Sequence, residues 1–580
     1  PIFAALLDAE RGGHWTLAPA SECKNRQRYR EDTNVLVTEW SAEAGSATVT
    51  DLVPVTSEEL KRRQLLPEHE FVREVRCTAG EMRFVMEFHP RPEYGRAAAK
   101  IRAASGLGYR MEIDGAAYWF RTNIPLTIGD DRATASFKMK QGEVAQFVLA
   151  FSQHSPAVLP ALGEPLSGRI EESVRWWRAW ADRSSYDGEY REAVRRSALT
   201  LKLLSYAPSG AIVAAPTTSL PEIIGADLNW DYRYCWLRDA SLTVRALLGL
   251  GYIDEAKGFL TWMLHATQLT QPELRTMYDI FGGLAPRERD LEHLSGYENS
   301  RPVRVGNGAR NQLQLDIYGE VIDAAAQYSR LVRRFDRTTQ NVLVGFGTYV
   351  AKNWNQPDEG IWEPRSGRQN HTHSRVMCWT ALDRLLEMHQ KGTLKNVPVE
   401  LFARERERIK LQILDQAWNE KVQSYAATLG GDSVDATLLR ISWYGLERVN
   451  SERMKKTYAR VRKDLGAGDS LLYRYAREPK EGAFGICGFW GAEYLATGGG
   501  TLEEAHDCFK NLLAYRNELG LYSEEIDPET GDALGNYPQA FTHIGLISTA
   551  LSLKEREKGE PHPAERRQSG PSTAQRSAAQ

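Results

Sequence analysis

The chain has 580 residues and a mass of 65.4 kDa, more than one ordinary domain holds, so we expect two domains. Hydrophobic residues make up 42% and charged residues 26%, and the formal net charge is −3, with lysine and arginine scattered along the chain. This composition argues against nucleic acid or a membrane as the main partner, and no apolar run approaches the roughly 20 residues of a membrane span.

The six cysteines lie far apart, and no C-x-x-C pair occurs. We therefore expect no disulfide framework, no metal and no organic cofactor, and we predict a cytoplasmic location. The sequence begins Pro1-Ile-Phe-Ala and shows neither a long apolar segment after a basic one nor an A-x-A cleavage site, so no export signal is visible. Because an initiator methionine is absent, it stays open whether residues precede Pro1.

Residues 1–165 predict an antiparallel β-sandwich. Runs of strand length alternate in polarity or carry β-branched and aromatic residues, and turn residues separate them, as at Thr78–Gly80. The runs are 35–40, 47–53, 71–77, 82–88, 118–121, 133–139 and 144–151. His69 and His89 are isolated in the sequence and are interpreted as structural, so this domain offers no catalytic group.

Residues 166–189 are expected to link the two domains. The segment from Ile170 to Trp180 is amphipathic and contains Trp176 and Trp177 as well. This pattern predicts a helix that packs between the domains.

The stretch Asn229–Ala240 reads N-W-D-Y-R-Y-C-W-L-R-D-A, which combines aromatic residues with arginine and aspartate. A core does not favour the charged residues, and a solvated surface does not favour the rings. The mixture therefore indicates a cleft that holds a flat polar ligand against rings while charged groups bind its hydroxyls. The simpler alternative is a buried ion pair between Arg238 and Asp239 with aromatic packing around it.

Helical periodicity extends over residues 190–556, where apolar residues recur at spacings of three and four. The predicted helices are 190–206, 239–250, 254–270, 312–335, 337–355, 372–391, 398–420, 434–446, 451–464, 484–497, 501–518 and 537–556. Short links follow every second helix and long links follow the others, which predicts six helical hairpins. Hairpins that close on themselves form an (α/α)6 barrel with every long loop at one end, where we expect the functional site.

Carboxylates stand out in two of the long loops. Glu363 follows Trp362, a setting that suits a proton donor, and Glu524 and Glu525 follow in a later loop. Two carboxylates from different loops that face one cleft are the minimum apparatus for glycoside hydrolysis. Because the chain contains 76 acidic residues, such pairs also arise by chance, and this pattern alone does not fix the function.

Two further features receive a structural interpretation. His371 and His373 have the spacing of possible metal ligands, but no third ligand is evident. Residues 557–580 lack aromatic and aliphatic anchors and predict a disordered tail.

Five motifs together resemble glycoside hydrolase family 15, the group of glucoamylases, glucodextranases and bacterial trehalases. They are N-x-D-Y-x-Y-x-W-x-R-D at 229–239, R-P-x-R-x-G at 301–306, G-x-W-E at 360–363, R-Y at 474–475, and S-E-E-I-D-P at 523–528 with N-Y-P-Q-A-F at 536–541. The resemblance covers nearly the whole chain and points to the compact bacterial form, in which a β-sandwich precedes an (α/α)6 barrel. That form usually carries a further segment before the point where this chain starts.

The resemblance implies the roles of the two carboxylates. Glu363 would be the general acid, and Glu524 the general base that activates water, with Glu525 as the alternative base. Members of the family invert the anomeric carbon, which fits two carboxyl groups about 6.5–9.5 Å apart with water between them.

The resemblance also implies the residues that bind the sugar. Arg238 and Asp239 would hold hydroxyls of the terminal glucose, and Arg474 would bind the same sugar or its neighbour. The remaining candidates are Tyr232 beside the developing oxocarbenium ion, Trp236 and Trp362 as walls, Arg301 from the second motif, and Tyr297 as the nearest aromatic counterpart of a family tryptophan.

We therefore predict an inverting, exo-acting α-glucoside hydrolase, with trehalase activity because the S-E-E-I-D form and the compact architecture resemble the bacterial trehalase branch. A glucoamylase-type hydrolase of malto- or isomalto-oligosaccharides is the alternative, and a non-catalytic glucan-binding protein on the same scaffold is the third hypothesis. The expected partner is a small α-glucoside or oligosaccharide substrate, and homo-oligomerisation stays open.

Overall fold

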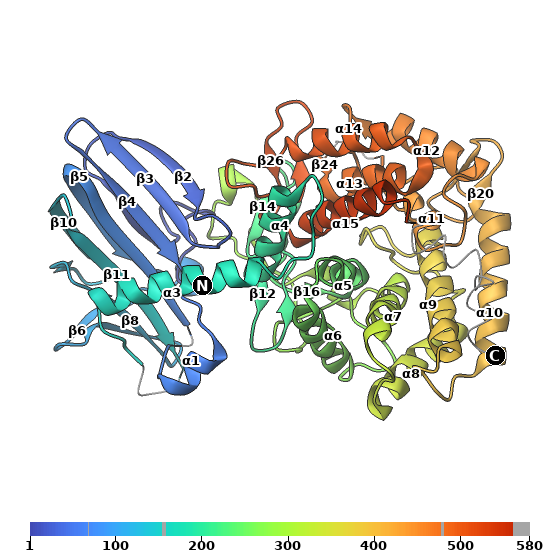
Figure 1. Ribbon diagram of the computed structural model, residues 1–580, viewed down its shortest axis with the longest axis horizontal. Coiled ribbons are helices and arrows are strands. Elements are labelled where there is room, and N and C mark those ends of the chain that lie inside the picture. Colours follow the sequence, from blue (N-terminus) through green and yellow to red (C-terminus); the bar gives the residue numbers. More distant parts are fainter. Residues whose placement is uncertain (68, 154–157, 477–480, 561–580) are drawn as a thin grey trace. The chain divides into compact units, whose positions relative to one another are not determined.

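The computed structural model describes residues 1–67, 69–153, 158–476 and 481–560, and the chain divides into two compact units (Figure 1). The first unit consists of Pro1–Arg183 together with Glu292–Asn299, and the second of Ser184–Leu291 with the chain from Ser300 onward. The predicted tail, 557–580, lies mostly outside the described residues. No helix in the described ranges is long and apolar enough to cross a bilayer.

The first unit is built from antiparallel strands, as predicted. Within the described residues these are β1 His14–Pro19, β2 Lys24–Tyr29, β3 Leu36–Ala42, β4 Gly45–Leu52, β5 His69–His89, β6 Arg102–Ala104, β7 Gly108–Ile113, β8 Ala116–Thr122, β9 Thr127–Ile128, β10 Ala133–Lys140 and β11 Val144–Ser152. One sheet has the order β2-β3-β4-β5-β11-β8-β7-β6, and β1, β10 and β9 extend from the other half of β5. Helix α1, Glu58–Arg63, the short α2, Pro92–Gly95, and α3, Glu164–Ala181, complete the unit.

Strand β5 takes part in both sheets, because its first half pairs with β4 and β11 and its second half with β1 and β10. The prediction of a turn at Thr78–Gly80 is therefore wrong. These residues bend one continuous strand, and the register to β4 shifts beside them. Gly80 has a φ of 61°, and a Cβ there would lie 2.2 Å from the carbonyl oxygen of Ala44. A bend of this kind uses glycine for the same reason as a turn, so the two look alike in sequence.

The two sheets share a single hydrophobic core, which confirms the predicted sandwich. Alternate residues of β5, including Phe84 and Phe88, meet Phe120 of β8 and Phe147 of β11, and the rings of Phe88 and Phe120 stack with centroids 4.2 Å apart. The isolated His89 makes a structural contact, since its Nε2 lies 3.1 Å from Asp131 Oδ2.

The segment Glu292–Asn299 packs within the first unit although its neighbours in sequence belong to the second. The backbone N–H of Ser295 donates to Asp8 Oδ2 at 3.0 Å, and His293 Nε2 donates to the carbonyl oxygen of Tyr94 at 2.8 Å. Tyr297, a predicted sugar ligand, lies in this segment and is described with the first unit.

The second unit contains twelve helices in its described part. They are α4 Arg191–Leu203, α5 Ala240–Gly249, α6 Ile253–Thr267, α7 Asp316–Tyr328, α8 Arg337–Asn353, α9 Thr372–Gln390, α10 Val399–Gln412, α11 Arg440–Trp443, α12 Glu452–Leu465, α13 Gly485–Tyr494, α14 Leu502–Leu513 and α15 Ala540–Glu557. Each one falls within a predicted helix or overlaps it. A capping box formed by Thr501 and Glu504 begins α14.

Alternate helices form a closed inner ring, in which α5, α7, α9, α11, α13 and α15 each contact the next and α15 returns to α5. Every residue of α13 is buried, whereas the outer α14 buries one face only. Figure 1 shows α14 at the upper edge of the second unit and α13 beneath it. This arrangement is the predicted (α/α)6 barrel. The long links, such as 354–371 and 514–539, all precede inner helices and therefore gather at one end.

Acid should destabilise this barrel through His543 on α15. The side chain is fully buried, its Nε2 accepts the Tyr522 N–H, and burial lowers its pKa from 6.5 to about 3. The unfolded chain binds a proton below pH 6.5 and the folded chain does not, so stability is lost as the pH falls from 6.5 toward 3. Over the first two pH units the loss is about 2 kcal/mol.

His543→Asn should flatten this dependence in urea unfolding measured across the acid range. The exposed His265 of α6 provides the matched control, because His265→Asn should leave the slope unchanged. An identical acid slope in the parent and His543→Asn proteins would contradict the prediction.

Candidate active site

Long loops at one end of the barrel carry the predicted catalytic residues. The link before α5 contains β15, Asn229–Asp231, β16, Cys235–Trp236, and a 3-10 turn at Leu237–Asp239. The link before α9 carries Glu363, and the link before α15 carries β25, Glu525–Ile526, directly after Glu524. Short strand pairings hold these loops in place: β15 pairs with Thr218–Pro221, β16 with Met277–Tyr278, and β25 with Ala483–Phe484 and Ala533–Leu534.

Glu363 has a left-handed backbone, with a φ of 56°, which is unfavourable for a residue other than glycine. One carboxylate oxygen, Oε1, accepts hydrogen bonds from Trp236 Nε1 at 2.8 Å and Arg238 Nη1 at 3.1 Å, with Gln314 Nε2 at 3.4 Å. Within the described part of the chain, no hydrogen bond is made to the other oxygen, Oε2. The strained backbone and three donors thus fix the carboxyl group and leave one oxygen for a ligand.

The ion pair between Arg238 and Asp239 is present, with Nε donating to Asp239 Oδ1 at 3.1 Å, and the same guanidinium reaches Glu363 and the carbonyl oxygen of Ile361. Burial acts to lower the pKa of Arg238, but Asp239 and Glu363 more than offset it and raise the pKa above its ordinary value. The guanidinium therefore stays charged and links the 3-10 turn to the loop of Glu363.

Aromatic rings adjoin both carboxylates. The rings of Tyr232 and Trp236 lie edge to face, with centroids 5.2 Å apart, and both are nearly buried. Trp362 donates through Nε1 to Asp435 Oδ2 at 2.9 Å and packs against Phe484. These rings exclude water from the polar groups between them, which strengthens each electrostatic contact.

Glu524 is fully buried, and its Oε2 accepts the backbone N–H of Asn536 at 3.3 Å. Burial raises its pKa to about 8, the neighbouring Glu222 acts in the same direction, and Tyr232 and Arg474 act against both. Tyr232 thus faces Glu524, and through its contact with Trp236 it connects Glu524 to the surroundings of Glu363.

Arg474 lies in a buried cluster of carboxylates. It donates through Nε to Glu481 at 2.5 Å and through Nη2 to Glu222 at 2.8 Å, and Glu525 lies 3.9 Å away. Oxygens of these three glutamates lie within 4.8 Å of one another, which is also a possible geometry for metal ligands. Because the guanidinium already contacts all three, we interpret the cluster as an ion-pair network.

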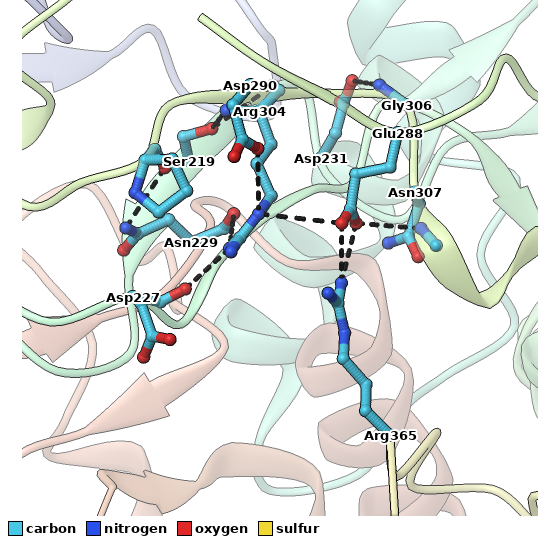
Figure 2. Close-up of polar contacts among 12 residues, drawn as sticks. Ser219, Asp227, Asn229, Asp231, Glu288, Asp290, Arg304, Gly306, Asn307 and Arg365 are labelled. Atoms are coloured by element: carbon cyan, nitrogen blue, oxygen red, sulfur yellow. Dashed lines mark hydrogen bonds and ion pairs between the residues drawn. The ribbon is translucent and has the colours of Figure 1, made fainter. Parts of the chain in front are cut away.

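The two arginines of the motif at 301–306 differ in burial. Arg301, a predicted sugar ligand, is exposed and makes no hydrogen bond or ion pair with any described residue. Arg304 is buried and donates to the carbonyl oxygens of Asp227 and Asn229, as Figure 2 shows.

His373 is buried, and burial lowers its pKa to about 3. Neither it nor His371 belongs to a group of three possible metal ligands in the described ranges.

Sequence reasoning missed several polar groups of the site. Gln314, Glu222 and Glu481 carry no motif of their own, and only the folded structure brings them to Glu363 and Arg474. A signal existed for the last two, because a buried arginine requires carboxylate partners.

Two carboxylates on long loops of one barrel end, joined through the same tyrosine and tryptophan, define the class as a glycoside hydrolase. The family model "Glycosyl hydrolases family 15" matches residues 188–551, and the chain belongs to this family. A second model, "Trehalase-like, N-terminal", matches residues 1–119.

The chain is similar over nearly its whole length to proteins named trehalase. A protein of Mycolicibacterium smegmatis named "Trehalase" is 34% identical over 96% of this chain and 86% of its own length. Another "Trehalase", from Thermoplasma volcanium, is 32% identical over 96% of this chain and 88% of its own. A solved structure described as "Glycosidase Wild Type" shares the fold, with a TM-score of 0.51, 18% identity, and coverage of 65% of this chain and 98% of its own.

Proposed function

We propose that this protein hydrolyses trehalose to two glucose molecules with inversion at the attacked carbon. The observation that carries the proposal is the fixed pair of Glu363 and Glu524, one with an oxygen left for a ligand and the other buried beside Tyr232. The similarity to proteins named trehalase supports trehalose as the substrate.

In this mechanism Glu363 protonates the oxygen between the two sugars through Oε2 while the bond to the anomeric carbon breaks. Glu524 removes a proton from a water molecule that attacks the opposite face of the sugar. Tyr232 lies beside the developing oxocarbenium ion. Arg238 and Asp239 supply a donor and an acceptor for hydroxyls of the attacked glucose.

Other parts of the sugar-binding site follow from the same assignment. Trp236 and Trp362 form its walls, and Arg474 is fixed by its carboxylates so that it binds sugar without rearranging. The cytoplasmic location and the homo-oligomer stay predictions from the sequence.

The test is a panel of trehalose, maltose, isomaltose and starch, assayed for glucose release and followed by proton NMR from the first minutes. Preferred cleavage of trehalose, with glucose released in equal α and β amounts, is expected, because attack inverts one sugar and the other leaves with its α configuration. Initial release of α-glucose alone would mean retention and overturn the mechanism. Preferred release from maltose or starch would favour the glucoamylase alternative, and no release at all would favour a binding protein.

Glu222→Gln should move the acidic limb of the kcat/KM profile to lower pH. Among charged neighbours, Glu222 is the main one that raises the pKa of Glu524, which burial already raises to about 8. Removing that negative charge favours the ionised base, so Glu524 loses its proton at a lower pH, and we expect a shift of about 0.5–1 unit.

The measurement is kcat/KM on trehalose as a function of pH. Glu405→Gln is the control, since it removes another buried glutamate, on α10, that pairs with Arg404 and Arg408 and should leave the limb in place. If the acidic limb of the Glu222→Gln profile stays at the same pH or moves to higher pH, Glu222 does not raise the pKa of Glu524.

A further inference from the structure

An exposed arginine follows the proposed acid in the same loop. The side chain of Arg365 is 55% exposed, and its Nη2 donates to both oxygens of Glu288, at 2.9 and 2.8 Å. Its guanidinium carbon lies 4.5 Å from the centre of the Trp230 ring. Arg365 thus combines a fixed position with access to solvent, which are the properties of a ligand-binding group.

A second arginine holds Trp230 but is not available to a ligand. The guanidinium carbon of Arg304 lies 4.6 Å from the same ring, and its Nη1 is occupied by the carbonyl oxygens of Asp227 and Asn229. Figure 2 shows Arg304 and Arg365 reaching Glu288 from different sides. Trp230, Glu288, Arg304 and Arg365 therefore form one group of contacting side chains. Arg304 is its buried member, and Arg365 and Glu288 are its outer, polar members.

Trp230 connects this group to both catalytic carboxylates. Asn536 donates through Nδ2 to the carbonyl oxygen of Trp230 at 2.9 Å, and its backbone N–H donates to Glu524. The Trp230 side chain packs against the cluster that contains Tyr232 and Trp236, and Trp236 binds Glu363. The pair Arg365–Glu288 therefore adjoins the site on the side of the loop that carries the acid.

The chemistry of the reaction says what lies on that side. A proton donor must contact the oxygen that joins the two sugars, so the leaving group lies beside Glu363. In trehalose the leaving group is a whole glucose with hydroxyls that both donate and accept. A guanidinium that donates and a carboxylate that accepts match those hydroxyls.

We propose that Arg365 and Glu288, positioned by Trp230, bind the glucose that leaves and so determine specificity for a sugar leaving group. This inference rests on the proposed function. It assigns the pair no part in the proton transfers at Glu363 and Glu524.

The test compares trehalose with α-glucosyl fluoride, whose leaving group is a single small atom. Arg365→Ala should lower kcat/KM on trehalose at least about tenfold and leave kcat/KM on the fluoride within about twofold of the parent. Arg365→Lys, which keeps the charge but not the planar guanidinium that lies over the Trp230 ring, should recover only part of the loss. Glu288→Gln should likewise affect trehalose selectively.

The matched control is Arg368→Ala. Arg368 lies in the same loop with a side chain 48% exposed and pairs with Glu359 at 3.1 Å, so it resembles Arg365 in exposure and pairing. Both substrates should react with this variant as with the parent.

Equal losses on both substrates in Arg365→Ala would show that the arginine only positions the loop that carries Glu363. Unchanged rates on both substrates would show that it does not contact the leaving sugar. Either result would overturn the proposal. Hydrolysis of neither substrate by the parent protein would instead overturn the proposed function, and this inference with it.

Discussion

Glu363→Gln should lower kcat on trehalose by about 10²–10⁴-fold, the contribution typical of general acid catalysis. The substitution removes the proton that the leaving sugar needs but keeps an oxygen that can accept the hydrogen bonds from Trp236 and Arg238. On α-glucosyl fluoride the loss should be much smaller, because fluoride leaves without a strong proton donor. Steady-state rates on both substrates, with thermal unfolding of each protein, make the comparison.

Glu359→Gln is the control for this experiment. Glu359 lies in the same loop, where its Oε2 accepts the Leu313 N–H and its Oε1 accepts from Arg368 Nε. Glutamine has one acceptor oxygen and can keep the contact with the Leu313 N–H, so only the half-exposed pair with Arg368 is lost and activity should persist. If Glu363→Gln lost the same factor on both substrates, Glu363 would not be the acid.

Glu524→Gln should lower kcat by a comparable factor, about 10²–10⁴, but on both substrates, because water must be deprotonated whatever group leaves. Glutamine fits beside the Asn536 N–H and preserves the packing around Tyr232. The contrast between the two variants on the fluoride therefore separates the acid from the base.

Glu525→Gln decides between the two neighbouring candidates for the base. Glu525 lies 3.9 Å from Arg474 and belongs to the ion-pair network, so its loss should weaken sugar binding more than it lowers kcat. A larger fall in kcat for Glu525→Gln than for Glu524→Gln would transfer the role of base to Glu525.

The fold was predictable from sequence because the hairpins repeat and their links alternate in length. The ends of the helices were less predictable. The helix expected to start at 312 starts at Asp316, since the N–H groups of Leu313 and Leu315 are bound by carboxylates of Glu359 and Asp358 in a distant loop. Such tertiary contacts override the local preference for helix and leave no periodic signal.

The site was predictable as far as its motifs extend. Glu363, Arg238 and Trp236 meet in the structure as one hydrogen-bonded group. The motif at 301–306 contains two arginines, and only contacts with distant carbonyl oxygens select Arg304 as the buried one. The left-handed backbone of Glu363 also has no signature in the sequence, because glutamate does not favour it.

The segment Glu292–Asn299 changes what counts as a domain in this protein. The polypeptide passes between the two units at three points, after Arg183, Leu291 and Asn299, instead of one. A fragment that ends at residue 183 would lack the partners that His293 and Ser295 give to Tyr94 and Asp8. Gene dissection at the apparent boundary would therefore not yield a self-sufficient first half, and the eight residues would have to be supplied in trans or by permuting the chain.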